Sequence, residues 1–288
     1  MGQNWAMNQM KRGLFLLATI CCVLFAGCTK TDDGTDVKED LSFLYKTYAR
    51  YNVGNNIYKN IWTYDGYKEI GYQTFMNGQL GAENKNYSYD GQNASWDTYY
   101  YHDGNANDVY ECHHVECEYL DNMFLRKKYQ KTEYYYGDSQ YDKIIESYYE
   151  YDGKKIVSFK EYSNGILTGE CDYNYDGLHC NYINTRYSSN VVIEKRTGNV
   201  VYLDDTYRRT KSSNCTIEYY NGTPSRTEYW VYDYDGKKKV GSHYYVNGKL
   251  VGVERDFRYD GLTCYYFSDF YQDGEVVSTQ MYEVEYLE

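Results

Sequence analysis

The chain has 288 residues, and its aromatic content is unusual, with 42 Tyr against only nine Phe. The formal net charge of −12 argues against nucleic acid and anionic membrane surfaces as partners, because like charges repel. The mean hydropathy of −0.82 argues against a thick aliphatic core. Tyr can bury its ring while its hydroxyl stays hydrated, so the composition favours a thin or strongly curved β-sheet.

The first segment has the features of an export signal. The basic pair Lys11-Arg12 precedes an apolar run that ends at Ala26-Gly27 and is too short for a comfortable transmembrane helix. The next residue completes a resemblance to the lipobox of bacterial lipoproteins, which implies cleavage before Cys28 and lipid on its sulfur. The alternative is an ordinary signal peptide with an incidental Cys. We predict a signal peptide at 1–27, whose removal takes away two positive charges and changes the net charge from −12 to −14.

A polar segment follows, and we predict a flexible tether at 28–40. Its run from Lys30 to Asp33 resembles the tether that exports Bacteroidota lipoproteins to the cell surface. The resemblance implies a protein of the outer membrane that is lipid-anchored and surface-exposed. Such a protein would contact the membrane through its lipid only.

The motif aromatic-x-Tyr-Asp-Gly occurs six times after the tether. Its Tyr-Asp-Gly triplets begin at Tyr64, Tyr89, Tyr151, Tyr175, Tyr234 and Tyr259. Asp-Gly between β-forming runs favours a two-residue hairpin turn, because both central residues must accept positive φ. The two aromatic residues are two positions apart, so they share one face of the incoming strand.

Longer spacings divide the body into three units. Tyr-Leu-acidic triplets begin at Tyr119, Tyr202 and Tyr286, which places the units at 41–121, 122–204 and 205–288. Within a unit, Asp-Gly and Asn-Gly turn signals recur every 12 or 13 residues, which leaves room for strands of about ten residues. We therefore predict an all-β fold, an antiparallel meander in which the three repeat units form one elongated, curved sheet.

The turn signals also predict which residues pair across one hairpin. If Asn247-Gly248 is a two-residue turn, Tyr245 faces Leu250 and Tyr244 faces Val251. One face of this hairpin is then the more apolar. The tyrosine ladders are accordingly interpreted as the core of the sheet.

Two known kinds of repeat resemble these patterns. The Tyr-x-Tyr-Asp-Gly motif is similar to the YD repeats of bacterial Rhs-type and other cell-surface proteins, although Gly here follows Asp directly. The segments 241–252 and 71–81 are similar to MORN-variant repeats of YwqK-type proteins. These resemblances imply a β scaffold, often in the cell envelope, and they bring no catalytic residues with them.

The cysteines and histidines give weak signals for chemistry. In the cluster from Cys112 to Cys117, Cys112, His114 and Glu116 would share one strand face, but the spacing matches no recognised zinc site. In a two-residue turn, Cys180 would face Tyr173, which leaves Cys171 too distant for an unstrained disulfide. We predict no metal and no cofactor.

The remaining candidate is a binding face rather than an active site. No nucleophile or phosphate-binding motif is present, so we predict a non-catalytic protein, with a glycoside-active enzyme as the residual alternative. Exposed Trp rings can contact sugars and proteins alike, and the mature chain has only Trp62, Trp96 and Trp230. We predict that they form a face for a glycan or a protein at the cell surface. The alternatives are structural packing of these rings and a structural or assembly role for the protein in an envelope complex.

Overall fold

The computed structural model describes residues 46–53, 55–102, 104–105, 107–122, 124, 126–136 and 143–286. The predicted signal peptide, the tether and Cys28 lie outside these residues. The described part of the chain contains no helix that is long and apolar enough to cross a membrane. Its strands are β1 (Lys46–Val53), β2 (Asn56–Asp65), β3 (Lys68–Met76), β4 (Gln79–Asp90), β5 (Asn93–Tyr101), β6 (Val109–Tyr119), β7 (Lys127–Tyr136), β8 (Lys143–Asp152), β9 (Lys155–Ser163), β10 (Ile166–Asp176), β11 (His179–Ser188), β12 (Val191–Tyr202), β13 (Thr210–Tyr219), β14 (Arg226–Asp235), β15 (Lys238–Val246), β16 (Lys249–Asp260), β17 (Thr263–Gln272) and β18 (Glu275–Tyr286).

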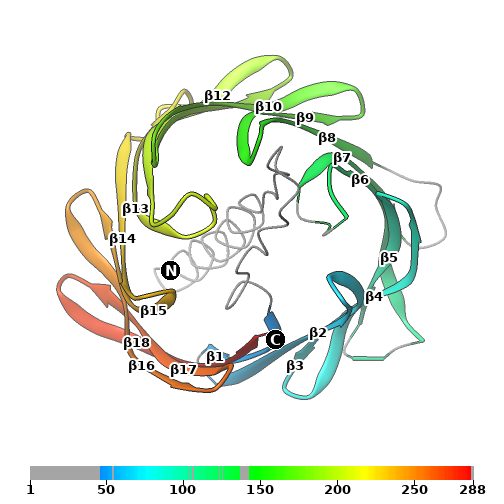
Figure 1. Ribbon diagram of the computed structural model, residues 1–288, viewed down its shortest axis with the longest axis horizontal. Coiled ribbons are helices and arrows are strands. Elements are labelled where there is room, and N and C mark those ends of the chain that lie inside the picture. The colour runs from blue at the N-terminus through cyan, green and yellow to red at the C-terminus, as the bar shows by residue number, and fades with distance from the viewer. Residues whose placement is uncertain are drawn as a thin grey trace, which may run out of the picture.

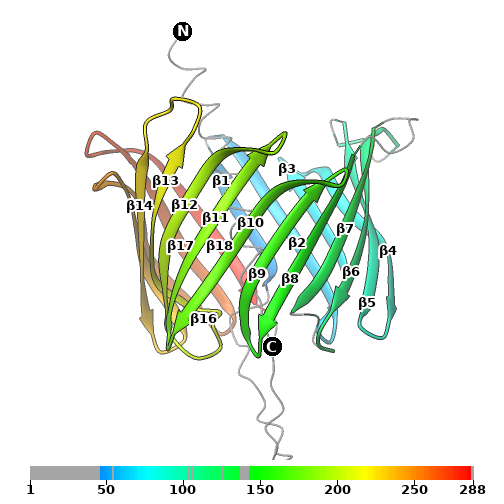
Figure 2. The ribbon, with the colours of Figure 1, turned by 90° about the horizontal axis from the view of Figure 1, so that it is seen from above.

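These strands form one closed barrel. Each strand pairs antiparallel with its neighbour in the chain, and β1 pairs with both β2 and β18, so that the 18-stranded sheet has no free edge (Figure 1). The predicted all-β antiparallel meander is confirmed, but the predicted elongated, curved sheet is wrong, because the sheet closes into a barrel. Large twisted sheets curl, and here the curl brings the first and last strands together, where they pair their otherwise open backbone groups. The strands are tilted in a common sense relative to the barrel axis (Figure 2).

The two ends of the barrel carry different types of turn. At the Asn-Gly turns both residues have positive φ, as at Asn247 (50°) and Gly248 (74°), which is the type I′ geometry. At the six Tyr-Asp-Gly sites only Gly has positive φ, for example Gly177 at 57°, and Asp176 still pairs with His179. The loop is therefore Gly-x in type II′ geometry, one residue later than predicted. Because consecutive strands alternate in direction, all six Gly-x turns lie at one end and the Asn-Gly turns lie at the other.

Bulges change the predicted register. Tyr245 pairs with Leu250 as expected, but a bulge follows, and Tyr244 faces Gly252 rather than Val251. The loop shift at Gly177 has a similar effect, since Cys180 faces Tyr175 instead of Tyr173. A bulge adds one residue to one strand and moves every later pairing by one position.

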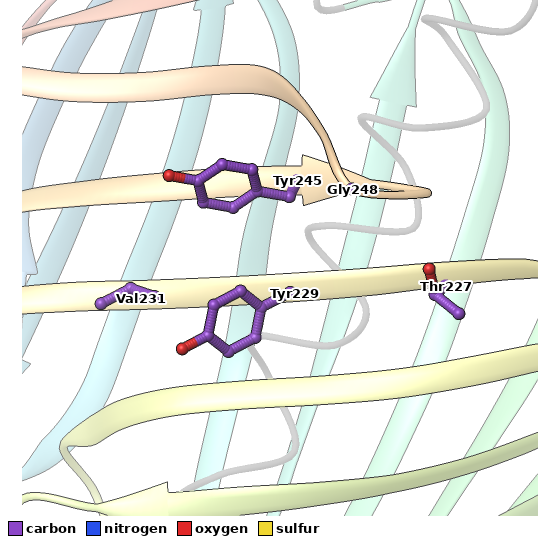
Figure 3. A pocket seen from close by; sticks show the side chains of 5 residues that line it. All are labelled: Thr227, Tyr229, Val231, Tyr245 and Gly248. Atoms are coloured by element: carbon purple, nitrogen blue, oxygen red, sulfur yellow. The ribbon is translucent and has the colours of Figure 1, made fainter.

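The two faces of the wall differ in chemistry. Figure 3 shows Tyr229 and Tyr245 on the outside of the barrel, in front of the strands that carry them. Since side chains alternate along a strand, Trp230 and Tyr244 point inward. The strand pairings then tell which side chains of the other strands point inward and which point outward. The inner face holds rings and small buried residues such as Cys264, which is 0 % exposed. The outer face carries most of the charged side chains.

Candidate functional site

A shallow outward groove crosses the hairpin of β14 and β15. It is lined by Thr227, Tyr229, Val231, Tyr245 and Gly248 (Figure 3). The rings of Tyr229 and Tyr245 are cross-strand partners with centroids 6.0 Å apart and an interplanar angle of 32°. Tyr229 is 43 % exposed, so part of its ring is available to a ligand. We call this surface the β14–β15 groove.

The groove continues into a row of amide side chains. Tyr229 pairs with Asn214, which pairs with Asn199, and the row continues through Asn181 to Asn174 on β10. Asn199 donates from Nδ2 to Oδ1 of Asn181 over 3.0 Å. All four amides are on the outer face, and all but Asn199 are largely exposed. Each amide offers both donors and acceptors, so an aromatic surface and a polar row lie side by side.

A second groove occupies the same place on the hairpin of β8 and β9. It is lined by Glu146, Tyr148, Glu150, Lys160, Tyr162 and Gly165, and we call it the β8–β9 groove. The two sites correspond because, at the open end of each hairpin, the Asn of the turn that follows the second strand binds the start of the first strand. Asn164 Oδ1 accepts the N–H of Ile144 over 2.7 Å, and Asn247 Oδ1 accepts the N–H of Thr227 over 2.8 Å.

The hairpin of β2 and β3 has the same Asn contact at its open end but carries a different surface. Asn77 Oδ1 accepts the N–H of Ile57 over 2.9 Å, as in the other two hairpins. Lys59 lies where Tyr229 and Glu146 lie in the grooves, with its Nζ 5.9 Å from the ring centroid of Phe75. The lysine stem and ammonium therefore cover the ring that would face a ligand.

Elsewhere the outer face carries ion pairs at mid-strand positions. Arg255 Nε lies 2.5 Å from Asp269, and Lys131 Nζ lies 2.6 Å from Glu133. The Arg255 guanidinium, ahead of a bond from Thr279, lowers the pKa of Asp269. These groups are charged at neutral pH, so the outer wall carries charges at mid-strand.

The three predicted Trp residues lie on the inner face and do not converge. Trp62 packs on Tyr72 at 5.3 Å between ring centroids, and Trp96 packs on Tyr87 at 5.7 Å. Trp230 stacks on Tyr244 at 3.6 Å and 14°. The three pairs are on different parts of the wall, since their Trp residues come from β2, β5 and β14.

The longest ring stack of the inner face crosses the line where the barrel closes. It runs from β16 to β2 through Phe257, Tyr266, Tyr282, Tyr51 and Tyr58, which we call the closure ladder. Successive centroids are 4.6, 4.7, 5.3 and 5.3 Å apart, with interplanar angles of 1°, 4°, 16° and 10°. All five rings are half-buried. Their faces cover one another, which indicates a packing role for this part of the inner wall.

The Cys112 to Cys117 cluster divides between the two faces. His114 Nδ1 lies 2.7 Å from Asp97 on the outside, whereas His113 lies inside, 4.1 Å from the Tyr134 ring centroid. Burial, with the charge of Asp97, raises the pKa of the Cys112 thiol to about 11. Within the described ranges no three His, Cys, Asp or Glu side chains are placed to hold a metal ion, and the described cysteines outside the leader are free.

No family model and no curated protein matches this chain. Among solved structures, it is similar to a porin-like protein from Bacteroides uniformis, with a TM-score of 0.45 and 7 % identity over 82 % of this chain and 95 % of that chain. It is also similar to a porin-like protein from Bacteroides vulgatus, with a TM-score of 0.39 and 13 % identity over 84 % of this chain and 98 % of that chain. Neither title names a ligand.

Sequence reasoning missed both grooves and the amide row. The four asparagines are unevenly spaced in the chain, and they align only once the turns and bulges have set the register. The grooves do carry one local signal. In both, an Asn-Gly turn follows the second strand of the hairpin, with a Tyr three residues before that Gly.

Proposed function

We propose that this chain is a non-catalytic lipoprotein of the outer membrane that binds a glycan on the outer face of its barrel. The observation that carries the proposal is the β14–β15 groove with the amide row beside it. A sugar ring has an apolar face that packs on an aromatic ring and hydroxyl groups that need donors and acceptors at its rim. Tyr229 supplies the first contact, and Asn214 and Asn199 supply the second.

The same outer face supports a lipid-anchored barrel that stands in water. A transmembrane barrel presents an apolar band to lipid, and a Lys or Arg at the bilayer midplane costs about 2–4 kcal/mol there. Arg255 and Lys131 lie on the outer wall at mid-strand, each with a carboxylate partner. Attachment through lipid on Cys28 would place the barrel at the membrane without burying these charges.

A second candidate function is structural. The closure ladder packs rings against rings, as expected of a wall built for stability rather than for ligand contact. A spacer or an accessory of an envelope complex would need no glycan. The resemblance to YD and MORN-variant repeats fits either role, because those repeats build scaffolds.

The test is binding of the purified mature body, residues 29–288, to an array of bacterial and host polysaccharides. We expect a specific hit that Tyr229→Ala and Asn214→Ala each weaken by about tenfold, the equivalent of losing about 1.4 kcal/mol of contacts. Tyr265→Ala is the matched control, because this ring is also outward and is 41 % exposed but lies outside the groove. Trp62→Ala, Trp96→Ala and Trp230→Ala test whether the inner face contributes. A blank array with folded protein would overturn the glycan proposal in favour of the structural one.

The anchor is tested separately in cells. In a host that processes lipoproteins, the wild-type chain should fractionate with membranes, and Cys28→Ala should release it. If the variant stays in the membrane fraction after a high-salt wash, attachment by lipid alone is wrong.

A further inference from the structure

The β8–β9 groove differs from its neutral counterpart in a way that points to another ligand. Three Tyr rings meet there at steep angles. The Tyr129 and Tyr148 centroids are 5.0 Å apart with an interplanar angle of 50°, and those of Tyr148 and Tyr162 are 5.8 Å apart at 87°. Rings at such angles can surround a small ligand group from several sides, whereas parallel rings form a flat stack.

A carboxylate lies at the hydroxyl end of two of these rings. The hydroxyl of Tyr129 donates to Oε1 of Glu146 over 2.9 Å, and the hydroxyl of Tyr148 donates to the same oxygen over 3.3 Å. Both bonds use Oε1, so Oε2 remains available to a donor from a ligand. Glu150 lines the same groove and is exposed, which adds a second negative charge.

Aromatic walls with nearby carboxylates form the arrangement that recognises organic cations. The negative face of each ring attracts the positive charge, and a carboxylate adds direct attraction. The neutral groove cannot do this, because Tyr229 stands where Glu146 stands here and no acidic residue lines it. We propose that the β8–β9 groove binds an organic ammonium group, such as that of an amino sugar or a choline headgroup, through Tyr129, Tyr148, Tyr162 and Glu146.

Lys160 sets the strength of this site. Its side chain lines the groove and pairs across the strands with Tyr148. Lys131 lies across from Glu146 and pairs with Glu133, and among the residues that line the groove, Glu146 and Glu150 face one cation, Lys160. An ammonium ligand must compete with this built-in cation, so removal of Lys160 should increase affinity.

The test is a titration of the mature body with tetramethylammonium, glucosamine and choline, followed by nuclear magnetic resonance at low ionic strength. N-acetylglucosamine and 3,3-dimethyl-1-butanol are the neutral counterparts of the second and third probes. We expect binding of the cations and not of the neutral molecules. Preference for glucosamine over choline would identify an amino sugar as the source of the charge, and the reverse preference would identify the headgroup.

Five variants make the assignment specific. Tyr148→Ala and Glu146→Gln should each weaken cation binding about threefold to tenfold, while Lys160→Gln should strengthen it. Tyr265→Ala, whose exposed outward ring lies outside both grooves, should leave it unchanged. Tyr162→Phe keeps the ring and should retain binding, which separates loss of a wall from loss of the fold. Equal binding of charged and neutral probes, or cation binding unaffected by Glu146→Gln and Tyr148→Ala, would overturn the proposal. This outcome is independent of the glycan result, since the two grooves share no residue.

Discussion

Tyr51 of β1 stacks on Tyr282 of β18 with ring centroids 5.3 Å apart and an interplanar angle of 16°, and this contact crosses the closure of the barrel. On its other side, Tyr51 stacks on Tyr58 of β2 at the same distance. The backbone pairing of β1 with β18 contains a bulge between Lys46 and Tyr48. The ring contact therefore strengthens the one strand pairing that joins the two ends of the sheet.

Replacing Tyr51 should weaken closure more than it weakens the rest of the wall. We expect Tyr51→Ala to lower the free energy of unfolding by about 2–4 kcal/mol, since a half-buried ring is lost. Tyr51→Phe keeps the stack and should cost much less. Denaturant unfolding measures the loss of stability in both variants. In Tyr51→Ala, the backbone amides of β1 and β18 should exchange hydrogen faster before those of the other strands do. Equal loss in the two variants would mean that the hydroxyl, and not the stack, matters.

Gly198 occupies a place on β12 that no side chain can fill. A Cβ there would lie 2.4 Å from the carbonyl oxygen of Asn214 and 2.6 Å from the ring of Tyr182. Gly198→Ala should therefore destabilise the protein by about 1–3 kcal/mol, because the ring or the strand must move. Gly169→Ala on β10 is the matched control, since its nearest atom would be 3.8 Å away. Similar melting temperatures for the two variants would contradict this explanation.

The folded state favours the protonated, neutral form of the Glu69 carboxyl group. Burial raises its pKa, against hydrogen bonds from the Tyr87 hydroxyl and the Asn84 amide. A carboxyl group with a raised folded pKa contributes stability below its unfolded pKa and loses it as pH rises through the folded pKa. Glu69→Gln should match the wild type near pH 3 and become the more stable protein as the pH rises. A stability difference that does not change with pH would rule this out.

Glu254 should show the opposite dependence. Burial opposes its ionisation, but Lys239, with a further bond from Ser242, outweighs burial and lowers its pKa. Its contribution is therefore present above the unfolded pKa and is lost as pH falls through the folded pKa. Glu254→Gln should destabilise the protein by about 1–3 kcal/mol at pH 7, because Lys239 loses its partner. The loss should shrink in acid, and a loss that persists at pH 2 would contradict the ion pair as its cause.

Local turn chemistry could be predicted from the sequence, whereas closure could not. Asn247-Gly248 has the positive φ values that its residues favour, and the strand lengths follow from the spacing of such turns. Nothing in the segments near Lys46 or Tyr286 indicates that they pair with each other, since closure depends on the accumulated curl of every strand between them. The outward amide row could not be predicted either, because it depends on the register of several successive strand pairs. The bulge beside Tyr244 shows how one extra residue decides which later partners meet.

The closed order of strands also has a consequence for how the chain folds. All pairings join strands that are consecutive in the chain except that of β1 with β18, which joins its two ends. Hairpins can therefore form as the chain emerges, but the last pairing must wait until β18 is available. Until then, β1 and the newest strand both offer unpaired backbone groups to other chains. The period between the emergence of β1 and the arrival of β18 is thus when this protein is most open to aggregation, and a truncation just before β18 would make that exposure permanent.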